Sequence, residues 1–349
     1  MPKLQSRLPQ IKDYPAHLNK MWDKHIQPRE DDAPTVISLF AGCGGSSLGY
    51  SMAGYKELLA VEWDDNAAET FKLNFPDVPV YHGDICKLSV DEVLETTGLK
   101  PGELDILDGS PPCQGFSTAG KRSFDDSRNQ LFKEYIRLLR GLQPKVFVME
   151  NVSGMVKGKM KLIFVEILKE LKASGYQVSA RLMNTMWFGV PQARQRIIFI
   201  GTRNDLKDLP SHPRVEKTPI TAGNSIKDIG IDGMFMFEKE NLLDLWNRCK
   251  AGKSFATVHP KGHYFNHQKA HPDKPFPTLT KTMSGISHWK IPGLLSIPMV
   301  KRCQSFPDQF KFIGKYSKQW GLMGNSVPPL FMEAIARHIK TNYLDKMNT

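Results

Sequence analysis

Short apolar runs that alternate with helical stretches determine how the first two hundred residues of this chain fold. The runs are VISLF (36–40), LLAVEW (58–63), VPVYHG (78–83), LDIL (104–107) and KVFVME (145–150). Each is long enough for a buried strand and too short for a helix. Strands that alternate with helices predict an α/β fold with a doubly wound, Rossmann-like sheet.

The alternation stops at about residue 203, and the chain then becomes rich in loops, glycine and proline. We therefore expect four parts. They are an N-terminal extension (1–33), an α/β domain (34–202), a smaller irregular domain (203–298) and a C-terminal segment whose helix returns to the first domain (299–349).

A glycine-rich loop, AGCGGSSLG at residues 41–49, follows the first predicted strand and leads into a helix. Glycines at this place allow tight turns and close approach of a ligand to the backbone. Glu62 ends the second predicted strand and Asp84 follows the third. Asp64 or Asp65 is available to cap the next helix, which leaves Glu62 for ribose hydroxyls. These features predict a nucleoside pocket.

The segment GSPPCQGFS (109–117) follows the run LDIL. Pro111 and Pro112 end that strand because proline donates no ladder hydrogen bond. Cys113 is the first side chain after the break, and Glu150 ends the strand KVFVME. Ligands of open α/β sheets bind at the carboxyl ends of the strands, so we expect this thiol and these acids to converge on one edge.

Basic residues dominate the second half of the chain. Between residues 245 and 290 there are eight Lys or Arg and one acid, Asp273, interleaved with Tyr264, Phe265 and Trp289. Cations mixed with aromatic side chains suit contacts with phosphates and bases. In FGVPQARQR (188–196), Arg194 and Arg196 are two apart and share a face if the chain is extended.

Four histidines recur every fourth residue in this region, at 259, 263, 267 and 271. That spacing binds metal on a helix, but Pro260, Gly262 and Pro272 argue against a helix and no acid or thiol ligand adjoins. We therefore predict no metal site.

The composition is that of a basic protein and favours a polyanionic partner and a cytoplasmic location. The 349 residues carry a formal net charge of +11, which favours a polyanionic partner. The five cysteines are scattered and form no Cys-x-x-Cys pair, so reduced thiols are expected. No apolar run has the length of a membrane span or a signal peptide.

Eight short motifs in order resemble those of the DNA (cytosine-5) methyltransferases of bacterial restriction–modification systems. They are AGCGG (41–45), Glu62, GDI (83–85), PPCQ (111–114), DSRN (126–129), ENV (150–152), QARQR (192–196) and GNSV (324–327). The resemblance extends from about Val36 to Tyr343, and PTLT (277–280) is similar to the Thr-Leu signature of the family's target-recognition domain.

The resemblance implies S-adenosyl-L-methionine as cofactor and double-stranded DNA as substrate. It implies a methyltransferase domain at 34–202 and a target-recognition domain at 203–298, in a protein that is monomeric and paired with a restriction endonuclease. The implied cofactor pocket consists of Phe40, Gly42, Gly45, Glu62, Trp63, Asp84, Ile85, Pro112, Leu131 and Asn325. The implied catalytic residues are Cys113, Glu150, Arg194 and Arg196, and the expected DNA contacts are Arg128, Lys261, Lys269, Thr278 and Lys281.

The residue chemistry agrees with these roles. Carbon 5 of cytosine is a poor nucleophile until a thiolate, here from Cys113, adds to carbon 6 while Glu150 protonates nitrogen 3. A free thiol of pKa ~8.5 is only a few per cent ionised at neutral pH, so nearby arginines or a proton transfer to a base must assist. The target base must also be flipped out of the duplex.

Three alternatives remain at this point. A tRNA cytosine-5 methyltransferase shares the scaffold, but its Cys-Phe-Thr tripeptide is missing from residues 203–299, where Cys249 precedes Lys250. A catalytically silent DNA-binding relative loses the cysteine or the glutamate, and both are present. A nicotinamide-dependent oxidoreductase needs Gly-x-Gly-x-x-Gly, which the glycine loop does not contain.

Overall fold

The computed structural model describes residues 8–112, 130–156, 160–206, 208–282 and 285–347. The chain forms two compact units. We name Gln27–Met183, Gln195–Pro213 and Glu333–Thr349 the sheet unit, and Met1–Ile26, Asn184–Arg194 and Arg214–Met332 the irregular unit.

The sheet unit contains a seven-stranded sheet in the order β3-β2-β1-β4-β5-β7-β6. The strands are β1 (Thr35–Leu39), β2 (Lys56–Glu62), β3 (Val80–His82), β4 (Ile106–Gly109), β5 (Val146–Val152), β6 (Tyr176–Asn184) and β7 (Gln195–Arg203). Neighbours from β3 to β5 run parallel, whereas β7 is antiparallel to β5. The strand order reverses between β1 and β4, which is where doubly wound sheets bind ligands. The predicted fold class is confirmed.

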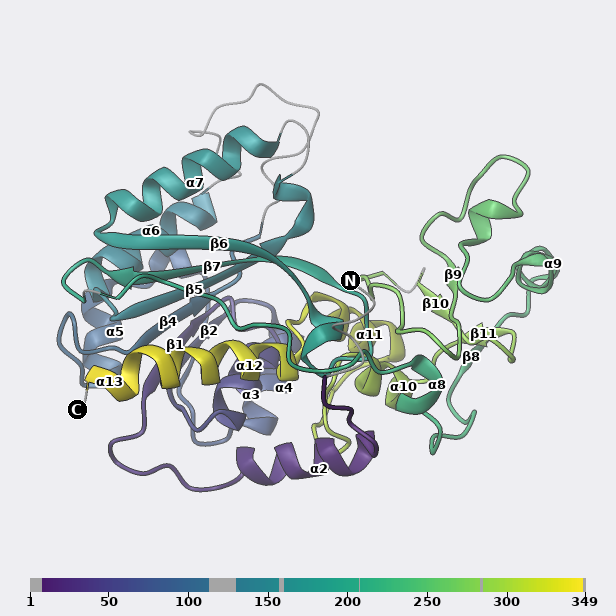
Figure 1. The fold of residues 1–349 in the computed structure, drawn as a ribbon, viewed down its shortest axis with the longest axis horizontal. Helices are drawn as coiled ribbons and strands as arrows, with labels where there is room; N and C mark the ends of the chain where they lie inside the picture. The colour runs from purple at the N-terminus through teal and green to yellow at the C-terminus, as the bar shows by residue number, and fades with distance from the viewer. Residues whose placement is uncertain (1–7, 113–129, 157–159, 207, 283–284, 348–349) are drawn as a thin grey trace. The chain divides into compact units, whose positions relative to one another are not determined.

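Helices cover both faces of this sheet (Figure 1). They are α3 (Gly45–Met52), α4 (Asp65–Asn74), α5 (Val90–Thr97), α6 (Gln130–Leu142) and α7 (Lys161–Ala173), with the turns η1 (Ile85–Lys87) and η4 (Ser153–Val156). The chain ends in α12 (Pro329–Ile339), the π-helical η8 (Lys340–Leu344) and α13 (Asp345–Met347).

Apolar side chains of α5, α6 and α7 pack on one face of the sheet, against residues such as Leu39, Leu107 and Phe147. The opposite face packs on α3 and on the C-terminal segment, where the hydroxyl of Tyr55 donates to the carbonyl of Ala336 at 2.9 Å. The apolar runs of the sequence form the central strands of the sheet. They are apolar throughout because both faces of the sheet are buried.

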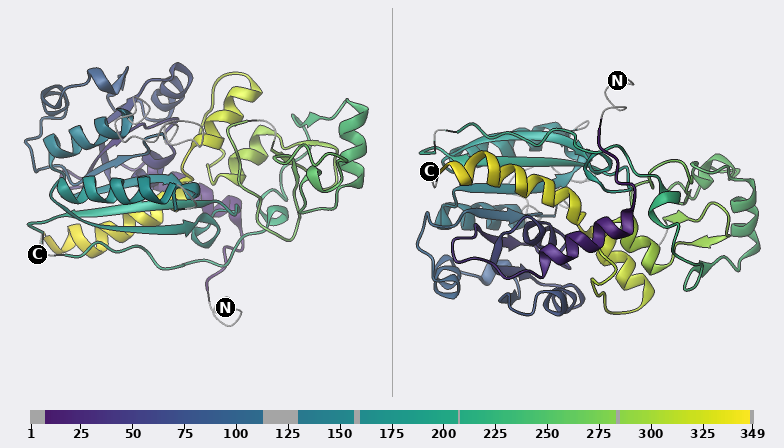
Figure 2. Two further views of the ribbon diagram at one scale, coloured as in Figure 1. Left: turned by 90° about the horizontal axis from the view of Figure 1, so that it is seen from above. Right: turned by 60° about the horizontal axis from the view of Figure 1, so that its bottom comes forward.

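The irregular unit holds short elements. Its helices and turns are α2 (Tyr14–His25), η6 (Thr185–Phe188), α8 (Ala222–Ser225), α9 (Glu240–Arg248), η7 (Phe255–Thr257), α10 (Ile297–Cys303) and α11 (Tyr316–Asn325). Four two-residue strands pair in the order β8-β11-β10-β9, namely β8 (Phe235–Met236), β9 (Gln268–Lys269), β10 (Ile286–Ser287) and β11 (Gly293–Leu294). Figure 2 shows α2, α10 and α11 from two further sides.

The limits of the two units differ from the expected domain limits. Within the predicted C-terminal segment 299–349, α10 and α11 belong to the irregular unit, and the sheet unit resumes at Glu333, inside the helix that the sequence predicts to return. The extension 1–33 is also divided, since α2 belongs to the irregular unit. There, the hydroxyl of Tyr14 donates to the carbonyl of Arg302 at 3.2 Å.

Among the helices of the described residues, none is both long and apolar enough to cross a membrane.

Gly44, the N-cap of α3, offers a test of how the glycine loop is held. Its φ is +93°, and a Cβ there would lie 2.5 Å from Cε2 of Phe75. Gly98 is also left-handed, at φ +70°, but its Cβ would meet nothing within 4 Å. We expect Gly98→Ala to lower the free energy of unfolding by about 1 kcal/mol, from backbone strain alone. Gly44→Ala should cost about 1–3 kcal/mol more, from overpacking, in urea unfolding without cofactor. Equal losses in the two variants would contradict the close packing on Phe75.

Candidate active site

The loop after β1 presents backbone groups toward the ligand edge of the sheet. Phe40 (φ +57°), Gly42 (φ +57°) and Gly44 (φ +93°) all adopt the left-handed conformation, which is unusual for a phenylalanine. The N–H of Gly42 donates to Oε2 of Glu62 at 2.7 Å. The glycine loop and the tip of β2 are therefore joined by a hydrogen bond.

Glu62 is buried and already holds three backbone hydrogen bonds. Besides Gly42, the N–H groups of Trp63 and Asp64 donate to its Oε1 at 3.0 and 2.8 Å. A carboxylate has about four acceptor positions, so one remains for a ribose hydroxyl. Asp64 caps α4 by accepting from the N–H of Ala67 at 2.9 Å, which confirms that one of the two predicted aspartates is the cap. The binding of a ribose by Glu62 stays a prediction.

The remaining predicted pocket residues of the sheet unit follow strand ends, except Leu131, which lies in the first turn of α6. Trp63 is 74% exposed, and Asp84 is exposed and accepts from the N–H of Cys86 at 3.0 Å. That hydrogen bond lowers the pKa of Asp84. Ile85 is buried, Pro112 is exposed and Leu131 is partly buried against the core.

These residues fit an adenosyl group. A Cβ on Gly42 would meet nothing within 4 Å, so open space adjoins the loop. The exposed indole of Trp63 offers a flat apolar face, and Glu62 and Asp84 offer acceptors. Asn325, the last residue of α11, belongs to the irregular unit.

The catalytic edge of the sheet carries an ion pair. Nε of Arg196 on β7 lies 2.8 Å from Oε1 of Glu150 on β5, and both side chains are largely buried. The antiparallel register pairs Val152 with Arg196 and Glu150 with Ile198, so the two charges are diagonal neighbours on one face. The pair orients the carboxylate that the sequence predicts to be catalytic.

Asn151 connects this strand end to the start of the cysteine loop. Its Nδ2 donates to the carbonyl of Pro111 at 3.2 Å, and its Oδ1 accepts from the N–H of Val152 at 2.8 Å. Cys113 and Arg128 themselves lie outside the described residues. The structure thus describes the support of the cysteine loop up to Pro112.

The expectation that Arg194 and Arg196 share a face is wrong. Strand β7 begins only at Gln195, and Arg194 belongs to the irregular unit. Its side chain is 2% exposed, and Nη1 donates to the carbonyls of Leu279 and Gly324 at 2.9 and 3.0 Å. In this conformation Arg194 joins two backbone segments of the irregular unit through its guanidinium.

Two of the expected DNA contacts make hydrogen bonds within the protein. Lys269 is buried, and its Nζ donates to the carbonyl of Trp246 at 3.0 Å and lies 3.5 Å from the centre of that indole ring. Burial lowers the pKa of Lys269. Thr278 Oγ1 donates to the carbonyl of Ala193 at 3.0 Å. Lys261 and Lys281 are exposed and stay predicted DNA contacts.

The Thr-Leu segment is fixed by the QARQR motif. Oε1 of Gln192 accepts from the N–H of Leu279 at 2.9 Å, while its Nε2 donates to Oε1 of Gln304 at 3.2 Å. Gln192 is fully buried. The bond from Leu279 to Gln192 thus holds PTLT (277–280) next to the start of QARQR (192–196), although the two motifs are far apart in sequence.

The described residues contain no group of three His, Cys, Asp or Glu side chains placed to hold a metal ion. The rings of His259 and His263 stack at 5.0 Å, and His267 packs 5.5 Å from Phe255.

Sequence reasoning missed a buried acid beside the site. Asp108 on β4 is 3% exposed, and its Oδ1 accepts from the hydroxyl of Tyr50 at 3.2 Å. Burial raises the pKa of Asp108 to about 7, and the nearby Glu150 adds to that rise. Burial likewise raises the pKa of Glu57 to about 8, although its Oε1 accepts from the hydroxyl of Ser47 at 2.9 Å. The sequence signal for Asp108 is its position directly after the apolar run LDIL (104–107), inside a predicted buried strand.

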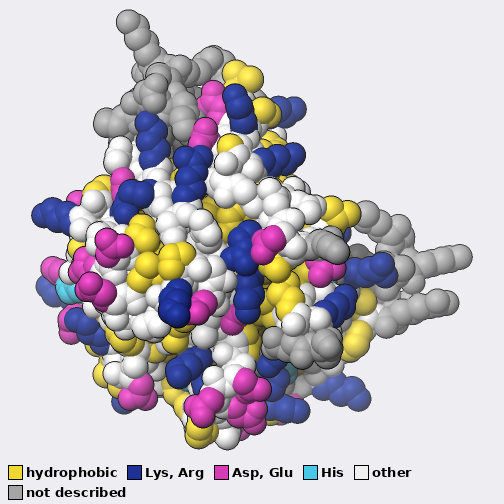
Figure 3. Space-filling model, turned by 90° about the vertical axis from the view of Figure 1, so that its left-hand side faces the viewer, with side chains coloured by type: hydrophobic (Ala, Val, Ile, Leu, Met, Phe, Trp, Pro, Cys, Tyr) yellow, Lys and Arg dark blue, Asp and Glu magenta, His cyan; other side chains and the backbone are white. Residues whose placement is uncertain are grey.

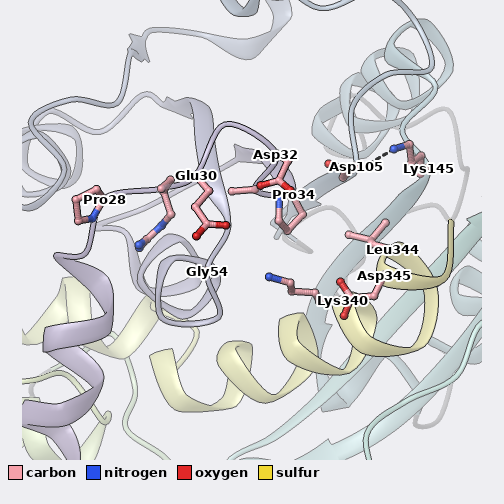
Figure 4. A pocket seen from close by; sticks show the side chains of 12 residues that line it. Pro28, Glu30, Asp32, Pro34, Gly54, Asp105, Lys145, Lys340, Leu344 and Asp345 are labelled. Atoms are coloured by element: carbon pink, nitrogen blue, oxygen red, sulfur yellow. Dashed lines mark hydrogen bonds and ion pairs between the residues drawn. The ribbon is translucent and has the colours of Figure 1, made fainter. Parts of the chain in front are cut away.

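A cavity of about 690 Å³ lies away from this edge, at the amino-terminal ends of β1, β4 and β5. Figure 4 shows the charged side chains around it, among them Lys340, Asp345 and the pair of Lys145 with Asp105, whose Nζ and Oδ1 are 2.7 Å apart. None of the predicted catalytic or cofactor residues lines it, so it is not the site described above.

Comparison with known families agrees with this geometry. Residues 34–341 match the family model of the C-5 cytosine-specific DNA methylases, which shows that the chain belongs to this family. It is a DNA cytosine-5 methyltransferase that uses S-adenosylmethionine.

The relatives cover most of both chains. Type II methyltransferase M1.HphI of Haemophilus parahaemolyticus is 36% identical over 90% of this chain and 87% of its own. Type II methyltransferase M.NgoPII of Neisseria gonorrhoeae is 32% identical over 87% of this chain and 95% of its own. A solved structure of a prophage-encoded protein of E. coli shares the fold, with a TM-score of 0.74 and 24% identity, and covers 90% of this chain and 100% of its own.

The raised pKa of Asp108 makes a prediction about stability. Between about pH 4, where an unfolded aspartate ionises, and about pH 7, the folded state binds one more proton than the unfolded state. Stability therefore falls as pH rises through this window, by about 1.4 kcal/mol per pH unit for this group. An asparagine side chain has nearly the shape of aspartate but does not ionise. We expect the free energy of unfolding of Asp108→Asn, measured in urea, to rise by about 1–3 kcal/mol relative to that of the wild type as the pH increases from about 5 to about 7.

Asp77→Asn, in an exposed turn, is the matched control and should follow the wild type at every pH. A constant difference between Asp108→Asn and the wild type across the window would show that Asp108 does not titrate there.

Proposed function

We propose that this methyltransferase is the modification enzyme of a restriction–modification system, methylating cytosine within one specific sequence of duplex DNA. The observation that carries the chemistry is the Arg196–Glu150 pair on the strand end whose Asn151 anchors Pro111. It places an oriented carboxylate beside the start of the loop that bears Cys113. The Type II relatives support the biological role.

In the proposed reaction, the target base is flipped out of the duplex and meets this edge of the sheet. The Cys113 thiolate forms a bond to carbon 6, and Glu150 in its protonated form delivers its proton to nitrogen 3, so that carbon 5 becomes an enamine nucleophile and Glu150 is left as a carboxylate. Bound S-adenosylmethionine supplies the electrophilic methyl group for carbon 5. Loss of the carbon 5 proton to a base and of the nitrogen 3 proton to Glu150 then expels the thiolate.

Within this scheme Arg196 is a positioning residue. Its Nε holds one carboxylate oxygen of Glu150, and its Nη1 is held by the carbonyl of Gln195 at 2.7 Å. The other carboxylate oxygen can then face the base. Glu62 and the backbone of Gly42 hold the ribose side of the cofactor pocket, with Trp63 beside them.

We further propose that the enzyme acts as a monomer, is paired with an endonuclease that cuts the same site, and works in the cytoplasm, on the nucleoid while bound. A tRNA substrate is the alternative to test.

Trapping on DNA tests the nucleophile. Fluorine at carbon 5 does not leave as a proton does, so duplex DNA containing 5-fluorocytosine should form a lasting adduct with the enzyme and S-adenosylmethionine. Peptide mapping should place that adduct on Cys113, and Cys113→Ala should form none and lose methylation while retaining DNA binding. Bisulfite sequencing of DNA methylated by the wild type should reveal the target site.

Cys86→Ser is the control, because Cys86 is an exposed thiol of the same unit and serine keeps a side-chain hydrogen bond to Asp84, so trapping should be unchanged. An adduct on tRNA and none on duplex DNA would replace the DNA assignment by the RNA one. Cofactor binding without any adduct would identify a silent relative.

Substitution of the paired carboxylate tests the proton transfer. We expect Glu150→Gln to lower kcat by about 100-fold or more, because general acid–base groups contribute about 10²–10⁴. Binding of S-adenosylmethionine, measured by calorimetry, should be retained. Glu69→Gln, an exposed change on α4, should leave kcat unaltered. A wild-type kcat in Glu150→Gln would remove Glu150 from the chemistry.

A further inference from the structure

A loop of the irregular unit, residues 254–268, extends from the four-stranded sheet between α9 and β9 (Figure 1). Its base is closed by an isolated antiparallel bridge between Ser254 and Gln268 and by the N–H of Phe255, which donates to the carbonyl of His267 at 2.8 Å. Gln268 then pairs with Ile286 of β10. We name this segment the 254–268 loop; it is fixed at both ends to the sheet.

Aromatic rings and histidines stiffen the loop from within. The ring of buried Phe255 packs against His267 at 5.5 Å, and Tyr264 lies edge-on to both His267 and His259, at 5.3 and 5.4 Å. His259 stacks on His263 at 5.0 Å, and its Nδ1 accepts from the N–H of His263 at 3.2 Å. This continuous set of contacts gives the loop a defined shape.

The backbone next to Phe265 is strained, and hydrogen bonds from a side chain hold it in this conformation. Tyr264 has a φ of +62°, a conformation that costs a non-glycine residue about 1–2 kcal/mol. The hydroxyl of Ser254 donates to the carbonyl of Phe265 at 2.8 Å and to that of Tyr264 at 3.3 Å. Strain that the surroundings maintain concentrates at ligand-binding positions. The strained turn presents the ring of Phe265 to solvent, where it is 75% exposed.

The charge around this ring has one sign. Residues 249–272 contain no Asp or Glu, and Lys250, Lys253 and Lys261 are exposed. The face of the protein drawn in Figure 3 is different, because acidic and basic side chains alternate over it. A rigid loop that combines an exposed aromatic ring with cations and no acids suits a polyanion with flat apolar faces, which is a nucleic acid.

We propose that Phe265 is a base-contacting residue of this methyltransferase, stacking on a base of the target site while Lys261 contacts a neighbouring phosphate. The proposal rests on the DNA methyltransferase function and names the side chain through which the irregular unit contacts the bases. A ring held by a stiff loop loses little entropy on binding, so its stacking adds to affinity. Phe265 therefore contributes to site preference, and Lys261 contributes to affinity for any duplex.

The test compares DNA affinity on two short duplexes, one with the site mapped by bisulfite sequencing and one with that site scrambled. Phe265→Ala should raise Kd for the site-bearing duplex about 5- to 150-fold, the range that base–aromatic stacking gives. Its salt dependence should stay that of the wild type. Phe265→Trp, which restores a stacking ring, should recover the affinity.

Lys261→Ala should weaken binding to both duplexes alike and reduce the slope of log K against log salt by about 0.9. The control is Leu209→Ala, which removes an equally exposed apolar side chain, 75% exposed, from the sheet unit. It should bind both duplexes as the wild type does.

Wild-type affinity and site preference in Phe265→Ala, with methylation intact in the wild type, would overturn the role of Phe265 and leave the enzyme's function standing. A wild type that methylates no duplex would instead overturn the function and the proposal together. Loss of affinity in both Phe265→Ala and Phe265→Trp, with thermal unfolding unchanged, would reject stacking as the mode of contact.

Discussion

The antiparallel pairing of β7 with β5 is the constraint on which the catalytic edge depends. Seven residue pairs along these strands set the register from Val146–Thr202 to Val152–Arg196, and this register places Arg196 diagonal to Glu150. A shift of one residue would turn the guanidinium to the other face of the sheet. The buried carboxylate would then lack its cation, which is costly in a low-dielectric site.

The same edge collects groups from strands that are distant in sequence. Glu62 ends β2, Asn151 lies near the end of β5, and Pro111 follows β4. Each of them is held by backbone hydrogen bonds rather than by flexible contacts. This arrangement places the cofactor loop and the start of the cysteine loop on one rigid scaffold, which is what transfer of a group between two bound partners requires.

The irregular unit is organised differently, by buried polar side chains that hydrogen-bond to backbone N–H and C=O groups. Arg194, Gln192 and Lys269 all serve this purpose. With strands of only two residues, the unit has little sheet to hold its loops, and side-chain hydrogen bonds take that role. Buried charged groups of this kind are paired because an unpaired one would destabilise the fold. Lys261 and Lys281, which stay exposed, remain the predicted DNA contacts.

The sequence alone determined the α/β class, the strand-end positions of Glu62, Asp84 and Glu150, and the family, because apolar period and motif order are local properties of the chain. Tertiary structure alone decided that Arg194 and Lys269 are buried, that Asp108 lies beneath the site with a raised pKa, and that Phe265 is exposed. A basic residue looks the same in sequence whether it meets a phosphate or a carbonyl. Which one it meets depends on backbone groups brought near by distant parts of the chain, and those distances exist only in the folded protein.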